Sequence, residues 1–300
     1  MNRILFRGIL PALVTPLDEK GGIREPVTRR LVGDLARKGI SGYYILGGTG
    51  EGVALDRDLR MAFAELVKDC APKGLPIINH IAAADLSTVR LLARHARKIG
   101  MDAIASVPPF FFHYDERGIL DYFRAMSDAS DGLPMLVYCS PFSGPPLSLA
   151  TVEKLLDVPG FVGLKYTSPN YYQMSLYKQL DNGNINILNG PDETCVLGLL
   201  MGADGAIGTT YNMTPELFVR LYDAVQAGDI ARAVQLQKHV NVLIRATIDC
   251  GKGIEAAKAA LQMMGYEVGD TVQPMQRMDE REKQVYFQAL RAIGFPDNYR

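Results

Sequence analysis

The amino-acid sequence predicts a (β/α)8 barrel followed by a C-terminal helical extension. Eight short apolar runs, many rich in β-branched residues, recur along the first three quarters of the 300-residue chain. Segments with apolar residues at helical spacing separate them. The runs are apolar throughout, without period-2 alternation, as a parallel sheet covered on both faces requires. Eight such units over about 225 residues match the size of a (β/α)8 barrel.

The expected strands and helices alternate in order along the chain. The strands span residues 9–14, 43–46, 76–81, 103–107, 135–138, 161–164, 185–188 and 205–207. The helices that separate the first five strands span residues 25–38, 56–69, 86–98 and 116–129. Each of these helices carries Arg or Lys opposite its apolar face, which is typical of a helix that packs on a sheet.

The last quarter of the chain is expected to be helical. From about residue 226 the strand-like runs stop, and helical patterns cover residues 230–248, 254–264 and 280–293. No linker or internal repeat marks a second independent domain. We therefore expect residues 226–300 to pack on the barrel of residues 1–225 or on a neighbouring subunit.

An open doubly wound sheet is the alternative fold. That fold carries a glycine-rich dinucleotide fingerprint in its first strand-to-helix turn. Here that turn has none, and the GGTGE sequence at residues 47–51 follows the second strand without the required spacing. The barrel is therefore the preferred prediction.

Composition favours a small-molecule partner. The chain is 48% hydrophobic and 22% charged, with a formal net charge of -1 and no Lys/Arg block. It therefore lacks the electrostatic footprint of a protein that binds nucleic acid or an anionic membrane. No apolar run approaches the roughly 18 residues of a membrane span, and Arg7 and Pro11 interrupt the first one, so no signal peptide is expected.

Cysteine and histidine spacing bears on location and metal binding. The four cysteines lack paired spacing, which is typical of reduced thiols in a cytoplasmic enzyme. The four histidines show no ligand spacing, so we expect no metal, and no other cofactor is expected. These residues are Cys70, Cys139, Cys195 and Cys250, and His80, His95, His113 and His239.

Lys165 is the first candidate for chemistry. It ends the apolar run of residues 160–164 and is followed by Tyr166, Thr167 and Ser168. An amine at the end of a buried strand is partly desolvated, which favours the neutral form that attacks a ketone. The alternative is a solvated surface group, which most lysines are.

Four polar clusters follow other expected strands, where barrel enzymes keep their catalytic groups. The GGTGE loop offers backbone amides and the Thr49 hydroxyl to a carboxylate, although it is equally typical of a tight turn. Tyr138 could exchange protons beside an imine or be an ordinary buried tyrosine. Asp192 and Glu193, after Gly190, could accept hydrogen bonds from a polyol or cap a helix. Residues 208–212 could donate to the same ligand.

The order of these clusters resembles one family. GGTGE after strand two, a tyrosine ending strand five, GLKYTS at strand six, NGPDE after strand seven and GADGAIGTTYN at strand eight are similar to the pyruvate-dependent class I aldolases grouped around N-acetylneuraminate lyase and dihydrodipicolinate synthase. The resemblance runs from residue 6 to about 218 and is looser in the last quarter. Residues 165–168, 189–193 and 209–212 look most like the sialic acid lyases.

The resemblance implies a role for each motif residue. Lys165 would be the Schiff-base nucleophile and Tyr138 the proton-transfer group. The pyruvyl carboxylate would be held by Gly48 and Thr49, and Thr167 would line the same pocket. The hydroxylated tail of the substrate would lie at Gly190, Asp192, Glu193 and Thr209. A homotetramer is also implied.

Three departures from the family pattern bear on substrate and mechanism. Gly48 stands where the family usually has a hydroxyl residue, and Phe111 lies in a Phe triplet where a second tyrosine is expected. His113 or Tyr114 could substitute for that tyrosine. The stretch at residues 142–144 lacks the arginine of dihydrodipicolinate synthases, which counts against their reaction.

Three functions therefore remain at this point. The first is a lyase that cleaves a 2-oxo sugar acid, such as N-acetylneuraminate, to pyruvate and an aldehyde. The second is a related 2-keto-3-deoxy sugar acid aldolase or dehydratase, or a condensing enzyme of the dihydrodipicolinate synthase type. The third is a barrel that binds 2-oxo acids without turnover. Imine formation without cleavage would identify the third.

Overall fold

Eight parallel strands form one sheet in the computed structural model, which describes residues 2–140 and 147–300. Along the sheet the strands follow the order β1-β8-β7-β6-β5-β4-β3-β2, and every described ladder is parallel. The strands are β1 (Gly8–Pro11), β2 (Tyr43–Ile45), β3 (Ile77–His80), β4 (Ala103–Ser106), β5 (Met135–Cys139), β6 (Phe161–Tyr166), β7 (Asn186–Asn189) and β8 (Gly205–Gly208).

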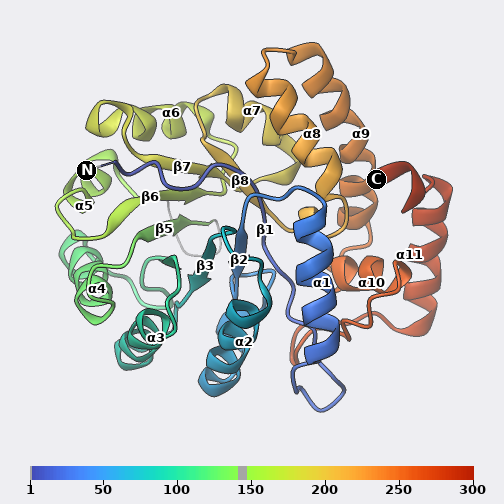
Figure 1. Cartoon of the computed structure of the whole chain (residues 1–300), viewed down its shortest axis with the longest axis horizontal. Helices are drawn as coiled ribbons and strands as arrows, with labels where there is room; N and C mark the ends of the chain where they lie inside the picture. The colour runs from blue at the N-terminus through green and yellow to red at the C-terminus, as the bar shows by residue number, and fades with distance from the viewer. Residues whose placement is uncertain (1, 141–146) are drawn as a thin grey trace.

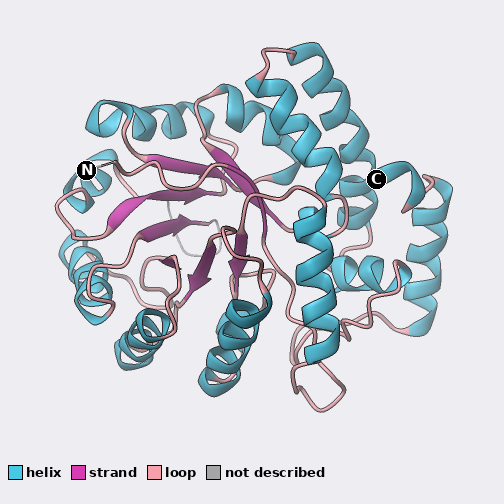
Figure 2. Ribbon diagram, in the orientation of Figure 1, coloured by secondary structure: helices cyan, strands magenta, loops and turns pink. Residues whose placement is uncertain are grey.

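The sheet closes between β1 and β2. Ala12 forms a parallel bridge with Tyr44, and the Leu13 amide donates to the Tyr44 carbonyl over 2.8 Å. Closure leaves no open edge of unpaired backbone groups. The strands form a central ring with helices around it (Figure 2), so the expected (β/α)8 barrel is confirmed.

Eight helices follow the eight strands in order. They are α1 (Glu25–Arg37), α2 (Arg57–Cys70), α3 (Leu86–Lys98), α4 (Glu116–Ala129), α5 (Leu149–Leu155), α6 (Tyr171–Gln179), α7 (Cys195–Leu200) and α8 (Pro215–Gln226). Helices α2 to α6 each begin at a residue whose side chain accepts a backbone N–H of the first turn. Such caps satisfy amides that have no partner within the helix. They explain where these helices start.

A separate hydrophobic core lies on each face of the sheet. The outer core fills the space between sheet and helices. The inner core fills the barrel, and its members are Phe6, Leu10, Ala12, Tyr44, Ile78, Ala103, Ala105, Leu136, Val162, Leu188 and Ile207. Because side chains alternate along a strand, each strand feeds both cores. This double burial explains why the strand sequences are mostly apolar, with polar residues chiefly at strand ends, as in β3 and β7.

The C-terminal extension consists of α9 (Ile230–Asp249), α10 (Ile254–Met263) and α11 (Glu280–Ala292), which lie together on one side of the barrel (Figure 1). Helix α9 packs along α8. Its Gln237 accepts from the Val196 amide over 3.0 Å and donates to the Asp192 carbonyl over 3.0 Å. The extension thus bonds directly to the segment after β7. The division of the chain at residue 226 stays a prediction.

Some element boundaries differ from those expected. The first strand was expected over 9–14, but β1 ends at Pro11, where ladder pairing with β8 stops. Lys165 was expected to follow the sixth strand, yet it lies inside β6 and pairs in register with Tyr138. Apolar content marks burial, whereas a strand ends where its neighbours stop pairing.

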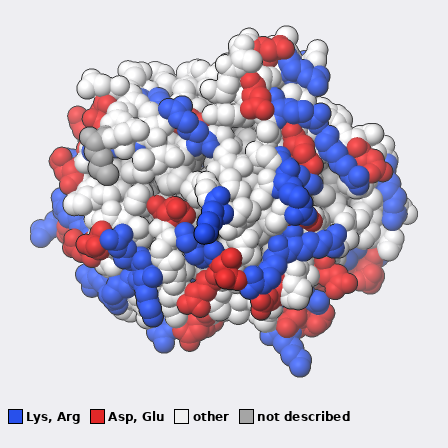
Figure 3. Space-filling model, in the orientation of Figure 1, with Lys and Arg blue, Asp and Glu red and all other residues white. Residues whose placement is uncertain are grey.

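Charges on the face seen in Figure 3 are mixed, with Lys and Arg interspersed among Asp and Glu. Mixed charge of this kind does not concentrate a field of one sign. Within residues 2–140 and 147–300, no helix has both the length and the apolar character needed to cross a membrane.

Candidate active site

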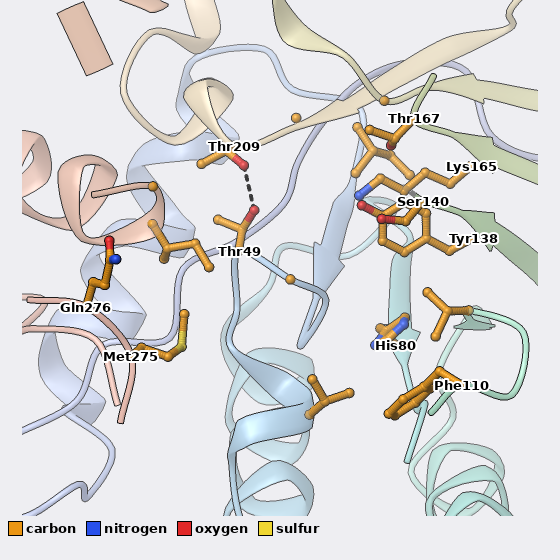
Figure 4. A pocket seen from close by; sticks show the side chains of 18 of the residues that line it. Thr49, His80, Phe110, Tyr138, Ser140, Lys165, Thr167, Thr209, Met275 and Gln276 are labelled. Carbon is orange, nitrogen blue, oxygen red and sulfur yellow. Dashed lines mark hydrogen bonds between the residues drawn. The ribbon is translucent and has the colours of Figure 1, made fainter. Parts of the chain in front are cut away.

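A pocket of about 650 Å³ opens at the carboxyl ends of the strands. Seven of the nine residues singled out from the sequence line it: Gly48, Thr49, Tyr138, Lys165, Thr167, Gly190 and Thr209. Figure 4 shows the five of them that have polar side chains. They come from five loops or strands that are far apart in the chain. The location agrees with the rule that barrel enzymes build their sites at this end.

A β-bulge in β6 directs Lys165 into the pocket. Met135 of β5 pairs with Phe161, but the next residue of β5 pairs with Gly163, so β6 contains one extra residue. Val162 lies in the inner core and Leu164 in the outer core. The extra residue shifts the alternation, so that Lys165 faces inward. Bulges commonly re-aim a side chain beside an active site.

Gly163 allows β6 to lie against β7 at the bulge. A Cβ built on Gly163 would lie 1.8 Å from the carbonyl oxygen of Asn186. No side chain fits there without moving one strand away from the other. Glycine at this position is therefore needed for the geometry that directs Lys165.

The Lys165 amine is nearly buried. The residue is 5% exposed, and its Nζ lies 4.1 Å from the ring centroid of Tyr138 and 4.4 Å from that of Tyr44. Its surroundings contrast with those of the buried Lys258, which pairs with Glu51, because none of the ion pairs in the described chain includes Lys165. Aromatic faces stabilise a cation less than a carboxylate would. The amine is thus available to react with a carbonyl group.

Tyr138 lies next to this amine and has an altered acidity. Burial raises its pKa, but the charge of Lys165 and a hydrogen bond with Ser140 outweigh that effect, so the pKa lies below its usual value. A phenol with a lowered pKa gives up and regains its proton more readily near neutral pH. The pair of Tyr138 and Lys165 can therefore support both nucleophilic attack and proton transfer.

Thr49 and Thr209 lie side by side in the pocket wall (Figure 4). Their hydroxyl oxygens lie 2.6 Å apart, which links the loop after β2 to the loop after β8. The backbone amides of Gly48 and Thr49 donate to no other residue in the described parts of the chain. A Cβ built on Gly48 would meet nothing within 4 Å, so this edge is open. The loop can therefore offer two N–H groups to an anion.

Thr167 and Gly190 lie in contact at another part of the wall. A Cβ built on Gly190 would lie 1.8 Å from the Thr167 hydroxyl oxygen. This oxygen is buried and lies close enough to the Tyr138 phenol to lower the pKa of that group. Glycine at 190 thus leaves room for a polar group that can meet a ligand.

Asp192 and Glu193 differ sharply in environment. Asp192 is buried and accepts from the Thr210 amide over 2.7 Å and from its hydroxyl over 2.6 Å. Burial raises the pKa of Asp192 to about 6, although the bonds from Thr210 oppose that rise. Its carboxylate also lies against Gly208, which lines the pocket. Glu193 is exposed and is not among the lining residues.

His80 is a pocket residue that the sequence did not identify. It ends β3, and its ring centroid lies 6.1 Å from that of Tyr138. Burial lowers its pKa to about 3, and the charges of Arg60 and Lys165 act in the same direction. The neutral ring donates from Nδ1 to the Leu46 carbonyl over 3.1 Å. A polar residue at the carboxyl end of an apolar run was the only available signal.

The C-terminal extension also supplies part of the wall. Its contribution is Gly251, Lys252, Gly253, Ile254, Met275 and Gln276. No motif in the sequence connects these residues with the barrel loops. Their place in the site follows from the packing of α9, α10 and the segment before α11.

The phenylalanine triplet is divided between pocket and surface. Phe110 lines the pocket, whereas Phe111 is 88% exposed and Phe112 is 70% exposed. His113 and Tyr114, the possible substitutes for a missing tyrosine, are not among the lining residues. The stretch at 142–144, noted for its lack of arginine, lies outside the described residues.

No group of three or more His, Cys, Asp or Glu side chains gathers as metal ligands within the described ranges. The chemistry that this arrangement can support is covalent and acid–base. A buried amine, a phenol of lowered pKa and a loop with two unbonded backbone amides share one pocket of about 650 Å³.

Known proteins resemble this chain over nearly its whole length. The N-acetylneuraminate lyase of Rhizobium meliloti (strain 1021) is 34% identical over 277 residues, which cover 92% of each chain. That of Escherichia coli (strain SMS-3-5 / SECEC) is 36% identical over 247 residues, 82% of this chain and 83% of its own. The structure of the wild-type sialic acid aldolase of Ruminococcus gnavus superposes on this chain with a TM-score of 0.93 at 29% identity. The superposition covers 98% of this chain and 99% of the aldolase.

The match to the family extends further than the motifs do. The motifs end near residue 218 and the last quarter was expected to match only loosely, but the sequence model described as "Dihydrodipicolinate synthetase family" covers residues 5–293. The helical extension is therefore part of the shared architecture. On this match and on the relatives above, the chain belongs to the dihydrodipicolinate synthetase family.

Proposed function

We propose that this protein is a lyase that cleaves a 2-oxo sugar acid to pyruvate and an aldehyde through an imine on Lys165. The observation that carries the proposal is the buried Lys165 amine, held against the ring of Tyr138 at 4.1 Å. Relatives named N-acetylneuraminate lyase at 34% and 36% identity support the same reaction class.

The first step joins the substrate to Lys165. The neutral amine attacks the keto carbon C2 and a carbinolamine forms. Tyr138 donates its phenol proton to the departing hydroxyl, so that water leaves and a protonated imine remains beside the Tyr138 phenolate. This cation lies in the same aromatic surroundings as the Lys165 amine, between the rings of Tyr44 and Tyr138. The imine nitrogen then acts as the electron sink for the next step.

The second step breaks the bond between C3 and C4. Its electron pair moves toward the imine and gives an enamine, while the C4 hydroxyl loses its proton and becomes the aldehyde carbonyl. Tyr138 receives that proton and later returns one to C3, for which its lowered pKa is suited. Water then hydrolyses the protonated imine and releases pyruvate, and the proton set free restores the Tyr138 phenol. No oxidant or reductant is consumed.

The remaining site residues bind the two ends of the substrate. The amides of Gly48 and Thr49 hold the carboxylate, and the Thr49–Thr209 bond keeps that edge in place. Thr167 and Gly190 line the path toward the tail. Asp192, whose carboxylate lies against Gly208 of the wall, accepts hydrogen bonds from the substrate's hydroxyl groups. Glu193 has the chemistry for the same role but lies outside the lining residues.

N-acetylneuraminate is the first substrate to test. A pocket of about 650 Å³ is of the size that holds a drug-sized ligand. The alternative is a shorter 2-keto-3-deoxy sugar acid, which the aromatic ring of Phe110 in the wall would favour. A panel of both acids distinguishes these substrates by their kcat/KM ratio.

A homotetramer in the cytoplasm completes the proposal. Phe111 and Phe112 are 88% and 70% exposed and lie beside Phe110 of the pocket. Exposed aromatic pairs of this kind are enriched at protein interfaces. A monodisperse monomer in light scattering would contradict the tetramer.

The test of the central step is intact mass after incubation with pyruvate and borohydride. We expect a lactyl-sized gain in the wild-type protein and none in Lys165→Ala. An adduct without cleavage of any sugar acid would indicate a barrel that binds 2-oxo acids without turnover. No adduct in either protein would refute the imine mechanism.

A further inference from the structure

Glu51, the last residue of the GGTGE sequence, has no role in the proposed chemistry. Its side chain is fully buried, as is that of Lys258 on α10, and Lys258 Nζ lies 2.5 Å from Glu51 Oε1. Removing two charges from water costs free energy that their attraction only partly offsets. Stability alone therefore does not account for a fully buried pair. The contacts that the pair makes indicate another role.

The pair joins three segments of the chain. Glu51 Oε2 accepts from the Val272 amide over 2.6 Å. Lys258 Nζ also donates to the Asp270 carbonyl over 2.9 Å. The loop after β2, helix α10 and the segment around residue 271 are thus connected through two side chains.

Each of these segments lines the pocket close to the pair. Thr49 lies two residues before Glu51, Ile254 lies one turn before Lys258, and Met275 lies three residues after Val272. Displacement of either charged group would therefore move the part of the wall that Thr49, Ile254 and Met275 form.

The loop itself is held in a strained conformation. Glu51 has φ 59°, in the left-handed region that few non-glycine residues adopt. A strained backbone persists where its surroundings hold it. The holding contacts here are the Lys258 pair, the Val272 bond and a bond from the Thr15 hydroxyl to the Gly50 carbonyl over 2.7 Å.

We infer that the Glu51–Lys258 pair is a positioning element that aims the amides of Gly48 and Thr49 at the carboxylate of the 2-oxo acid. The C-terminal extension thereby takes part in carboxylate binding as well as in packing. This inference rests on the proposed function, because it assigns the carboxylate to that loop.

The double variant Glu51→Gln/Lys258→Met tests the inference. It removes both charges at similar volume, and the amide oxygen introduced at position 51 can still accept from Val272. The matched control is Asp204→Asn/Lys178→Met, which removes a 2.8 Å pair at the opposite end of β8. Borohydride trapping is measured against two probes: pyruvate, and hydroxyacetone, a ketone that lacks the carboxylate.

We expect the half-saturating pyruvate concentration to rise about tenfold in Glu51→Gln/Lys258→Met, the loss of roughly one hydrogen bond to a charged group. Trapping of hydroxyacetone should stay within twofold of wild type. The control should leave both probes unchanged. If the double variant fails to fold, Glu51→Asp is used in its place. This variant keeps the charge but shortens the side chain, and it should also raise the half-saturating pyruvate concentration.

Two results would overturn the inference. One is unchanged half-saturation by pyruvate in the folded variant. The other is an equal loss with both probes, which is the behaviour of a merely structural pair. Absence of an adduct in the wild-type protein would instead refute the proposed function, so the two failures are distinguishable.

Discussion

The substitution Gly163→Ala tests whether the bulge in β6 directs Lys165. The built Cβ lies 1.8 Å from the Asn186 carbonyl oxygen, whereas real Cβ contacts do not fall below 3.0 Å. The strands β6 and β7 must therefore separate locally by about 1.2 Å. Overpacking of a well-packed interior typically costs about 1–3 kcal/mol. Misplacement of a reacting group by about 1 Å can cost on the order of 100-fold in rate.

We therefore expect Gly163→Ala to lose about 100-fold in kcat/KM. Borohydride trapping of pyruvate on Lys165 should slow in parallel, because the same amine performs both reactions. Thermal unfolding measures the accompanying loss of stability.

The control is Gly33→Ala on α1, where the nearest atom to the built Cβ is 3.5 Å away. This variant should gain stability, since alanine favours a helix interior over glycine by about 1 kcal/mol. A Gly163→Ala protein with wild-type melting temperature and wild-type trapping rate would refute the reasoning.

Two further predictions concern Asp192 and the threonine pair. The pKa of Asp192 is about 6 in the folded protein, against an ordinary value of 3.8. Its favourable contribution to the free energy of unfolding is therefore present below pH 3.8 and is lost as the pH rises through 6. Asp192→Asn should therefore gain stability relative to wild type between pH 4 and pH 7, by at most on the order of 3 kcal/mol; thermal melts at both pH values check this, and a constant difference would contradict it. Thr49→Val and Thr209→Val should each raise the half-saturating pyruvate concentration about tenfold in trapping assays. If the two hydroxyls joined by the 2.6 Å bond act together, the double variant should lose no more affinity for pyruvate than either single variant. Fully additive losses of affinity would contradict this prediction.

Much of the fold followed from local patterns. Continuous apolar runs predicted the eight strands, because a strand that is buried on both faces needs apolar residues at most positions. Helical spacing of apolar residues predicted the first four helices. The helices α5, α6 and α7 were not assigned from the sequence, since six to nine residues carry too few turns to show a helical period. The 12-residue helix α8 was not assigned either.

The site was predicted in part for a similar reason. Lys165, Tyr138 and Thr49 were identified because a polar residue at the end of an apolar run is a local signal, and seven of the nine residues singled out line one pocket. His80 gave only a weak signal of this kind. Met275 and Gln276 gave no such signal, because the local sequence does not determine which loop their segment packs against.

The sequence by itself determined the order of strands and helices, the apolar character of both cores and the chemical groups available to the site. Only the tertiary structure decided how those groups meet. Lys165 faces the pocket because β7 lies against Gly163 at the bulge, and Glu51 is buried because α10 brings Lys258 to it. These outcomes depend on contacts between segments distant in the chain, whereas periodicity and local propensity report only on near neighbours.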